Sequence, residues 1–439
     1  MSVDDRPRRH PTLPAVHEAW LPREHALHRP RHGGRQLVAL VCALIFFVTP
    51  GLCWALGARP TEIENRPIAA FPSPSAGWGF FTGLAQWATD HLVFRGAAVQ
   101  AEDGLSRSVF GEPAPFDRGG NQQGGPLAGT PGENGPSPSD ATGGDHAGFP
   151  TVIQGKDGWL YFGQDVASKC QPARPLDATI QTLQRLRRAV EDSGRKFVLL
   201  VPPDKTTMVP QYLPDSYAGK ECAQRASAEF WRRITTEAGA VDLRPMLQEA
   251  AARVGRPVYY PQDTHWTDEG AMMLAADLAE HLQPGVTRTW ATHQQPQEYA
   301  APSDLPKLIG RSGTNHAHVY ALAPDGQQDR TQQLTFPFDH PTETTTAPGT
   351  GVVGGKVELL HDSFTYPAAR YLAAGFADVT MVTYGSLGKY QAEVVNSLID
   401  KQVIAVEVVE RNVAGGDAAL LDPGVVTQIA QVLAQHPMR

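Results

Sequence analysis

The chain has 439 residues, a formal net charge of −8 and hydrophobic residues at 41% of its positions. This length is enough for at least one globular domain with a sizeable core, with residues left over for anchors and linkers. The lysines and arginines are scattered and form no basic patch of the kind that nucleic-acid-binding proteins use, so we expect no nucleic acid partner.

Residues 37–56 form an apolar segment without a charged side chain. About 20 apolar residues is the length that crosses the core of a lipid bilayer as a helix. Seven arginines lie within residues 1–35, and a cationic flank tends to stay in the cytoplasm. We therefore predict a single-pass anchor in the cell membrane at residues 36–57, with the rest of the chain outside the cytoplasm. The alternatives are a buried core helix and a signal peptide cleaved near Ala55 and Gly57.

Three regions around this anchor differ in composition. Residues 1–35 are rich in Arg, Pro and His and show no apolar periodicity, which predicts a disordered cytoplasmic tail. Residues 58–110 carry aromatic and aliphatic side chains at helix-like intervals, which predicts a juxtamembrane helical segment that packs on the main domain. Residues 111–149 consist mostly of Gly, Pro, Ser, Asn and Asp, which is typical of a disordered linker.

In residues 150–439, strand-like and helix-like segments alternate. Helical patterns cover residues 176–193, 224–238 and 268–282, and apolar strand patterns cover 196–201, 357–360, 379–383 and 403–409. Apolar strands bounded by helices indicate a mainly parallel sheet that is covered on both faces. We predict a three-layer α/β domain. The polar, Pro- and Thr-rich residues 285–355 interrupt the alternation and are predicted to form an insertion or a rim.

The cysteines fit a location outside the cytoplasm. Cys42 and Cys53 lie in the apolar segment, and Cys170 and Cys222 are the two that follow it. An oxidising compartment permits a disulfide between the latter pair, which would stabilise the fold by roughly 4 kcal/mol in the chain-entropy model. Two unrelated free thiols are the alternative.

The first candidate for catalysis lies in residues 261–270 (PQDTHWTDEG). In an extended stretch, alternate side chains share a face, so Asp263 and His265 can reach the same pocket. A carboxylate beside an imidazole fixes its tautomer and stabilises its protonated form, as a general base requires. The alternative is structural: Asp263 satisfies a turn, and Thr267 with the two acidic residues after it caps the next helix.

The second candidate is Ser363, which follows the apolar run Leu359-Leu360 and precedes a helix-like stretch. The carboxyl ends of parallel strands face the crevice in which ligands bind, so a nucleophile would be useful at this position. The N-terminus of the following helix would offer backbone N–H groups to an oxyanion. A simple N-cap role for Ser363 is the alternative.

Together the two segments resemble the SGNH hydrolase-like proteins of the alginate O-acetyltransferase type, in which an Asp-x-His-Trp element precedes a serine at a strand end. Ordinary SGNH esterases have the serine first. Further pieces of the sequence share the resemblance: residues 64–67 (ENRP), 71–72 (FP), 90–95 (DHLVFR), 155–160 (GKDGWL), 201–205 (VPPDK) and 410–412 (ERN). The sequence departs from the pattern at His361-Asp362, where related serine motifs often have a glycine, and in the length of 111–149. These departures leave the acceptor and the oxyanion geometry open.

The resemblance implies an SGNH-like catalytic domain over residues 150–439, in which Ser363 is acylated, His265 acts as base and then as acid, and Asp263 orients His265. The implied reaction transfers an acetyl group to hydroxyls of an extracellular or cell-wall polysaccharide. The implied acyl supplier is a multi-pass membrane acyltransferase, and no cofactor is expected because no nucleotide- or coenzyme A-binding motif is seen. An acyl-ester hydrolase with the same triad and a non-catalytic glycan-binding assembly protein are the alternatives.

Three other residues are weaker candidates for substrate binding or the oxyanion site. Trp266 is either a platform that stacks on a sugar or a buried support for His265. Arg411 and Asn412 follow the strand at 403–409 and either line the crevice or form a solvated turn. We expect no metal site, because His361 and Asp362 are adjacent on a strand and so face opposite sides, and no zinc-ligand spacing is present.

Overall fold

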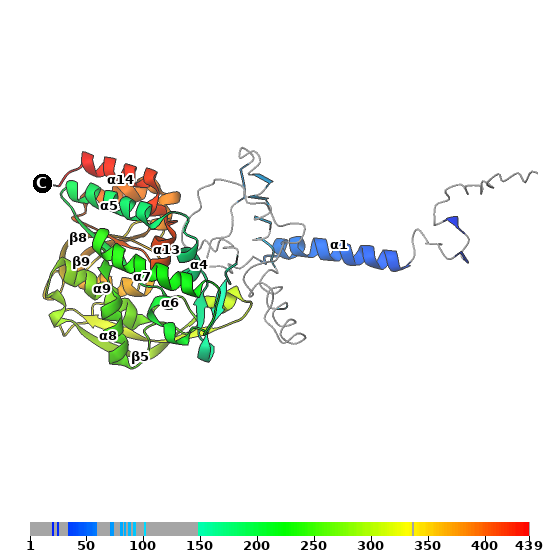
Figure 1. Cartoon of the computed structure of the whole chain (residues 1–439), viewed down its shortest axis with the longest axis horizontal. Coiled ribbons are helices and arrows are strands. Elements are labelled where there is room, and N and C mark those ends of the chain that lie inside the picture. Colours follow the sequence, from blue (N-terminus) through cyan, green and yellow to red (C-terminus); the bar gives the residue numbers. More distant parts are fainter. Residues whose placement is uncertain are drawn as a thin grey trace, which may run out of the picture.

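A computed structural model of the chain describes residues 34–58, 148–335 and 338–438, together with isolated positions between 20 and 101 (Figure 1). The predictions of a tail at 1–35, a helical segment at 58–110 and a linker at 111–149 therefore concern residues that lie almost wholly outside the described part. The predicted anchor and the predicted catalytic domain lie almost wholly within it.

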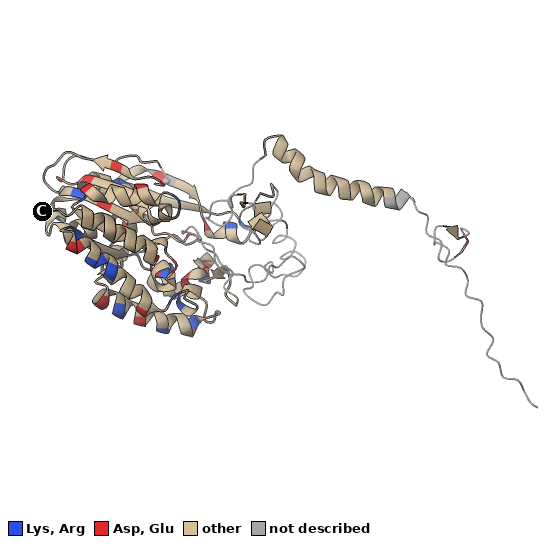
Figure 2. Cartoon of the chain, turned by 90° about the horizontal axis from the view of Figure 1, so that it is seen from above, with Lys and Arg blue, Asp and Glu red and all other residues tan. Residues whose placement is uncertain are grey.

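The N-terminal helix α1 (Gly34–Ala55) extends away from the folded body of the protein (Figure 1). Its segment Leu37–Ala55 has a mean hydropathy of 2.4 and is not buried against any other element. In Figure 2 the ribbon of this helix is tan beyond its grey end, so no Lys, Arg, Asp or Glu is marked along the tan part. Within the described residues, this is the one helix that is long and apolar enough to cross a membrane, and a signal sequence would have the same properties.

The main domain is built on a six-stranded sheet with the order β4-β3-β10-β8-β9-β7. The first five strands of this order are parallel, and β7 pairs with β9 in the antiparallel direction. The predicted mainly parallel sheet is therefore confirmed, with an antiparallel edge that the sequence patterns did not predict. The strands are β3 (Lys196–Val201), β4 (Val241–Asp242), β7 (Thr342–Thr345), β8 (Val353–His361), β9 (Phe376–Thr383) and β10 (Val403–Glu407).

Helices cover both faces of this sheet, because its central strands are apolar on both sides. Along β3, Val198 and Leu200 pack into one core cluster, whereas Phe197, Leu199 and Val201 pack into the other. The first cluster contains α8 (Arg244–Val254), α9 (Asp268–Leu282) and α11 (Thr365–Gly375). The second contains α5 (Leu176–Asp192), most of the buried side chains of α7 (Lys220–Glu237), α12 (Gln391–Ser397) and α14 (Pro423–Gln435). The domain thus has the three layers that were predicted.

The predicted insertion at 285–355 contains ordered β structure. It contains the long antiparallel hairpin of β5 (Ala291–Pro302) and β6 (Thr314–Ala323) as well as the edge strand β7. The hairpin register runs from Ala291 opposite Ala323 to Pro302 opposite Thr314. The sequence patterns missed these strands because their side chains are mostly polar or small, so they lack the apolar run of a central strand.

The remaining elements are short and lie around the main sheet. Helix α4 ends at Cys170, which forms a disulfide with Cys222 in α7 at a Cα–Cα distance of 5.7 Å. The other short elements are β1 (Val152–Gln154), β2 (Leu160–Phe162), α4 (Gln164–Cys170), α6 (Lys205–Met208), α10 (Leu305–Leu308) and α13 (Glu410–Gly415). Single 3-10 turns occupy Lys156–Gly158, Pro210–Tyr212, Val286–Thr289, Tyr384–Gly388, Leu398–Asp400 and Ala419–Leu421.

Candidate active site

Asp263 and His265 lie in the loop that precedes α9. The backbone of this loop bends at both residues and is not extended, contrary to the expectation from alternation. One oxygen of Asp263, Oδ1, accepts hydrogen bonds from the backbone N–H of His265 at 3.1 Å and from its Nδ1 at 2.7 Å. An aspartate that accepts from the backbone two residues ahead forms an Asx turn. The turn, and not a shared strand face, therefore brings Asp263 into contact with His265.

Ser363 lies two residues beyond the end of β8, at the carboxyl end of the parallel sheet. Its hydroxyl Oγ is 2.9 Å from Nε2 of His265, although 98 positions separate the two residues. Helix α11 starts only at Thr365 and has no side-chain N-cap hydrogen bond. The N-cap alternative for Ser363 is therefore wrong, and its side chain is directed to His265 instead.

The charges of Asp263 and His265 depend on each other. Burial opposes ionisation of Asp263, but the hydrogen bonds from His265 and Asn315 and the charge of His265 together outweigh it and hold the pKa of Asp263 well below its usual range. Burial likewise opposes protonation of His265, but the hydrogen bond and charge of Asp263 raise its pKa above the ordinary value. An ionised Asp263 needs a donor, so neutral His265 carries its proton on Nδ1. Its Nε2 is then free to accept the proton of Ser363.

The second oxygen of Asp263 is held by two groups that the sequence analysis missed. Oδ2 accepts from the backbone N–H of Asp304 at 3.0 Å and from Nδ2 of Asn315 at 2.7 Å. Both residues belong to the segment predicted as an insertion, and they lie 41 and 52 positions from Asp263. No local pattern in the sequence links them to the Asp-x-His element; only the β5–β6 pairing brings them there.

The side chain of Asp304 is a second acid beside His265. It accepts from the backbone N–H of Thr264 at 3.0 Å and from the hydroxyl of Thr264 at 2.5 Å, and it lies 3.7 Å from Nδ1 of His265. Burial and the neighbouring Asp263 raise the pKa of Asp304 to about 6.

Asp263, His265 and Asp304 are close enough to act together as metal ligands, since one ligand atom from each lies within 4.8 Å of the others. All four carboxylate oxygens nevertheless accept hydrogen bonds from N–H or O–H donors. A cation would have to displace such donors, so the chemistry of this group favours hydrogen bonding over metal ligation.

Lys205 holds the loop that contains Asp263 and His265 through hydrogen bonds to its backbone. Its side chain is 1% exposed, and Nζ donates to the backbone carbonyls of Tyr260, Pro261 and Asp263 at 3.1, 3.2 and 2.5 Å. Burial lowers its pKa to about 8. An ammonium group with three carbonyl acceptors has all three of its donors satisfied, so it fixes the path of the backbone at Asp263.

Trp266 does not offer a face to a sugar. Its side chain is fully buried, and Nε1 donates to the backbone carbonyl of Phe364 at 2.9 Å. The two rings also meet edge to face, with centroids 5.2 Å apart. Of the two roles considered for Trp266, the sugar platform is therefore wrong. Trp266 instead connects the loop of His265 to the turn of Ser363.

Arg411 is buried and Asn412 is half-buried, so the solvated-turn alternative does not fit them. Arg411 is 7% exposed and pairs with Asp165 and Asp204 at 3.5 and 3.4 Å, while its guanidinium lies 5.3 Å from the ring centroid of Phe364. Asn412 donates to the hydroxyl of Tyr384 at 2.7 Å. The two residues thus lie behind the turn that carries Ser363, where they support it.

Asp362 links that turn to β10. Its Oδ1 accepts from the backbone N–H of Phe364 at 3.0 Å, and its Oδ2 accepts from the backbone N–H of Val409 at 2.9 Å. Its own N–H donates to Glu407 at 3.1 Å. The neighbouring His361 is fully buried, which lowers its pKa to about 4, so this imidazole is neutral. Hydrogen bonds of Asp362 thus hold the turn that carries Ser363 to β10 and to Val409.

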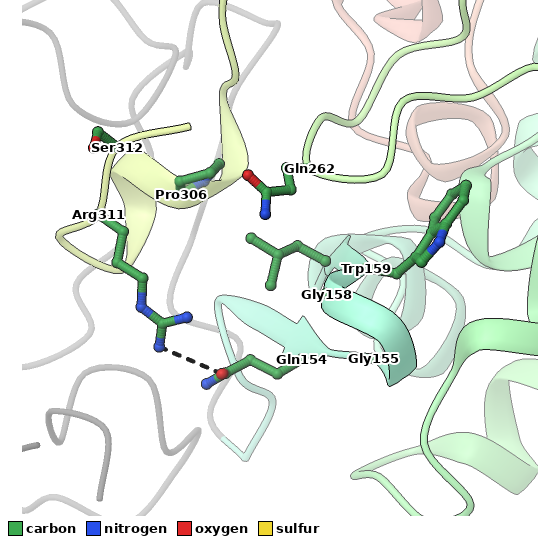
Figure 3. Close-up of a pocket in the computed structure, with 9 residues that line it drawn as sticks. Gln154, Gly155, Gly158, Trp159, Gln262, Pro306, Arg311 and Ser312 are labelled. Atoms are coloured by element: carbon green, nitrogen blue, oxygen red, sulfur yellow. Dashed lines mark hydrogen bonds between the residues drawn. The ribbon is translucent and has the colours of Figure 1, made fainter. Parts of the chain in front are cut away.

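A pocket of about 140 Å³ borders the loop at Gln262, the residue before Asp263 (Figure 3). In Figure 3, Gln262 and Arg311 lie on either side of the pocket, and Nη2 of Arg311 donates to Gln154 at 3.3 Å. The lining residues come from the β1–β2 hairpin, the loop that contains Asp263 and His265, and the region of α10: Gln154, Gly155, Gly158, Trp159, Leu160, Gln262, Pro306, Arg311 and Ser312.

The described domain has a mostly parallel α/β sheet with Asp263, His265 and Ser363 in hydrogen-bond contact at its carboxyl end. Residues 152–337 match the family described as "SGNH hydrolase-like domain, acetyltransferase AlgX", which confirms the resemblance predicted from the sequence. The matched region includes Asp263, His265 and Asn315 and ends before Ser363.

Known proteins with similar sequences carry the description "Probable alginate O-acetylase AlgJ". The one from Pseudomonas syringae pv. tomato is 32% identical over 133 residues, which are 30% of this chain and 33% of the relative. The one from Pseudomonas putida is 26% identical over 203 residues, which are 44% of this chain and 49% of the relative. The chain thus matches about a third to a half of the length of these relatives.

A solved structure described as "O-Acetyltransferase Domain of Pseudomonas putida AlgJ" aligns with 64% of this chain and 98% of its own, at 19% identity and a TM-score of 0.43. The structure of AlgX from Pseudomonas aeruginosa aligns with 62% of this chain and 66% of its own, at 16% identity and a TM-score of 0.41.

Proposed function

We propose that this chain is a serine-dependent O-acetyltransferase that transfers an acetyl group, through an acyl-Ser363 intermediate, to hydroxyls of an extracellular or cell-wall polysaccharide. The hydrogen-bond chain from Asp263 through His265 to Ser363, at 2.7 and 2.9 Å, is the observation that carries the proposal. The match to an acetyltransferase domain supports the type of reaction. The names of the relatives support a polysaccharide acceptor.

In the first half-reaction, Ser363 attacks the carbonyl carbon of an acetyl ester. Nε2 of His265 takes the hydroxyl proton as the Oγ–C bond forms, because a serine hydroxyl is a weak nucleophile while it keeps its proton. The imidazolium is stabilised by Asp263, which remains ionised throughout. When the tetrahedral intermediate collapses, His265 returns the proton to the leaving alcohol of the donor, and the acetyl group stays on Ser363.

In the second half-reaction, a sugar hydroxyl replaces the donor. His265 is neutral again and takes the proton of the acceptor hydroxyl, whose oxygen attacks the acyl-serine carbonyl. The bond to Oγ breaks, and His265 returns the proton to Ser363. If water takes the place of the sugar, the same steps release acetate, so the exclusion of water decides between transfer and hydrolysis.

The pocket at Gln262 is the proposed contact for the acceptor. It is smaller than the roughly 300 Å³ at which pockets for drug-sized ligands begin, which suits one residue of a polysaccharide. Amide, hydroxyl and guanidinium groups at Gln154, Gln262, Ser312 and Arg311 match the hydrogen-bonding groups of a sugar. Its position beside the loop of Asp263 would keep the acceptor chain close to the reacting centre.

The proposed location is the outer face of the cell membrane, with α1 as a single-pass anchor. The apolar, unburied surface of α1 supports this location. A multi-pass membrane acyltransferase would supply the acetyl group from across the bilayer.

The test uses the purified full-length chain in detergent with 4-nitrophenyl acetate as donor, with and without alginate oligomers or a neutral glucan. We expect acetyl-Ser363 by mass spectrometry and acetylated oligomer as product, and neither in Ser363→Ala. Arg311→Ala should lower oligomer acetylation and leave acylation of Ser363 unchanged, whereas Arg253→Ala, on the exposed face of α8, should change neither.

The alternatives predict different products. Free acetate as the sole product, whatever the glycan, would support an ester hydrolase. Equal cellular acetylation of the glycan by the wild type, Ser363→Ala and His265→Ala would support a non-catalytic assembly protein and reject the enzyme.

A further inference from the structure

We propose that Asn315 is a positioning residue for the proposed reaction: its amide holds Asp263 in the orientation that His265 requires, and Ser303 fixes the direction of that amide. The inference rests on the proposed function for its effect on rate. The geometry behind it can be tested without turnover.

The contact between Asn315 and Asp263 is short and shielded. Nδ2 of Asn315 lies 2.7 Å from Oδ2 of Asp263, and the two residues are 9% and 5% exposed. A hydrogen bond to an ionised carboxylate is stronger than one between neutral groups, and burial strengthens it further. An amide supplies this donor without adding a positive charge that would oppose protonation of His265.

Asn315 completes the hydrogen bonding of Asp263. Oδ1 accepts two hydrogen bonds from His265, and Oδ2 accepts one from the backbone N–H of Asp304 and one from Asn315. A rotation of the carboxylate would break contacts on both oxygens, so Asn315 and His265 hold it from opposite ends. Asn315 also contributes to the lowered pKa of Asp263. Without this donor the carboxylate has more freedom to turn away from Nδ1, and His265 then loses the preferred tautomer.

Ser303 determines which end of the Asn315 amide meets Asp263. Its hydroxyl donates to Oδ1 of Asn315 at 2.7 Å, and Ser303 is fully buried. The two ends of an amide have nearly the same size, but the oxygen end would repel a carboxylate. A donor at Oδ1 therefore orients Nδ2 toward Asp263. Ser303 is itself held by its N–H, which donates to Gly313 across the end of the β5–β6 hairpin at 3.0 Å.

This arrangement gives the segment predicted as an insertion a part in the proposed chemistry. Pro302 and Thr314 are paired at the end of the hairpin, so Ser303 and Asn315 each follow one of these partners directly. The register of the hairpin thereby places the side-chain amide of Asn315 beside the loop that contains Asp263.

The variants for the test are Asn315→Ala, Asn315→Asp and Ser303→Ala, with Thr314→Ala on the exposed neighbouring position as the matched control. We expect Asn315→Ala to lower kcat for acetyl-ester turnover by roughly 10- to 100-fold, which is about 1.4–2.7 kcal/mol in activation free energy, with KM little changed. Tm should also fall, because a buried hydrogen bond is lost. Ser303→Ala should have a smaller effect in the same direction, and Ser303→Thr should restore activity. Thr314→Ala should match the wild type.

Asn315→Asp keeps the shape of the side chain and separates positioning from packing. It replaces the donor by a carboxylate that repels Asp263 at pH 8, and it becomes a donor again when it is protonated. The ratio of its kcat to that of the wild type should therefore rise as the pH falls. The other titratable groups at Asp263 are His265, Asp304 and Lys205, which both proteins share, so the wild type is the reference at each pH.

A second readout is independent of turnover. Nitrogen-15 NMR of His265 should show the Nδ1–H tautomer in the wild type and a mixture of tautomers in Asn315→Ala. An unchanged tautomer together with an unchanged kcat would overturn the inference. A changed tautomer in a protein whose Ser363 is never acylated would reject the proposed function and keep the role of Asn315 in orienting Asp263.

Discussion

His265 owes its basicity mainly to Asp263 and in part to Asp304. The ionised Asp263 raises the pKa of His265 although burial alone would lower it. A general base acts in its neutral form, so acylation of Ser363 should increase as the pH rises through this raised pKa and level off above it.

Replacement of Asp263 by asparagine tests this coupling. Asp263→Asn removes the charge that favours the imidazolium, so the midpoint of the pH–rate profile should move to lower pH. The maximal rate should fall by up to about 10⁴-fold, because His265 loses the acceptor that selects its tautomer. Stopped-flow measurement of Ser363 acylation over pH 5–9 provides both quantities. A midpoint that stays in place or rises would contradict the coupling.

At the scale of single residues, the sequence indicated the site residues that stand in a local motif. It did not indicate those that reach the site from a distant part of the chain. Asp263, His265 and Ser363 were identified because each stands in a short, recognisable context. Asp304 and Asn315 were missed because their approach to Asp263 depends on the pairing of β5 with β6. Two roles stayed open for Trp266 and for Arg411, because a sequence pattern does not reveal whether a polar or aromatic side chain is buried.

Among the elements, α4 and α13 meet behind the catalytic turn through a cluster of buried charges. Lys169 pairs with Asp204 at 2.7 Å and with Glu410 at 2.9 Å, and Arg411 pairs with Asp165 and Asp204. Every one of these side chains is at most 8% exposed. The cluster joins α4, the end of β3 and the start of α13.

Loss of one cation from this cluster should be costly. Arg411→Met leaves Asp165 and Asp204 buried with less compensation, so the free energy of unfolding should fall by roughly 3–5 kcal/mol. Arg253→Met is the matched control, because Arg253 and Glu249 form a pair at 3.6 Å with side chains 63% and 77% exposed. Such pairs contribute roughly 0–1 kcal/mol. Urea denaturation, followed by circular dichroism, measures the free energy of unfolding of both variants. If Arg411→Met lost no more stability than Arg253→Met, the expected contribution of the buried cluster would be contradicted.

The longer parallel strands of the central sheet were predictable because their apolar runs differ from the sequence around them. The runs at 196–201 and 357–360 mark β3 and β8, and the pattern at 268–282 marks α9. Strands β5, β6 and β7 have no comparable signal. Their pairing is stabilised by neighbours far along the chain, and this information is not contained in a short window of sequence.

At the scale of the whole molecule, α1 and the folded domain have opposite solvent requirements. Leu37–Ala55 is apolar and unburied, whereas the domain carries charged side chains over its surface (Figure 2). An exposed apolar segment of this kind would favour aggregation in water, which supports the proposed membrane anchor.

Deletion of residues 1–58 tests the anchor. The full chain should sediment with membranes and resist extraction by alkaline carbonate, and the shortened chain, exported with a separate signal peptide, should be recovered in the soluble fraction with Ser363 still open to acylation. Sequencing of the mature N-terminus distinguishes a retained anchor from cleavage near Ala55. A full-length, uncleaved chain that carbonate releases would contradict anchoring.

The strand order of the sheet also has a consequence for biosynthesis. Strand β10 lies between β3 and β8, although it is the last strand along the chain. A ribosome that has made Asp263, His265 and even Ser363 has therefore not yet made the strand that brings β3 and β8 into one sheet. Ser363 and His265 therefore come together only when nearly the whole polypeptide is available. If they carry the proposed reaction, a nascent or prematurely terminated chain should not cleave acyl esters, and this activity should begin only after synthesis is complete.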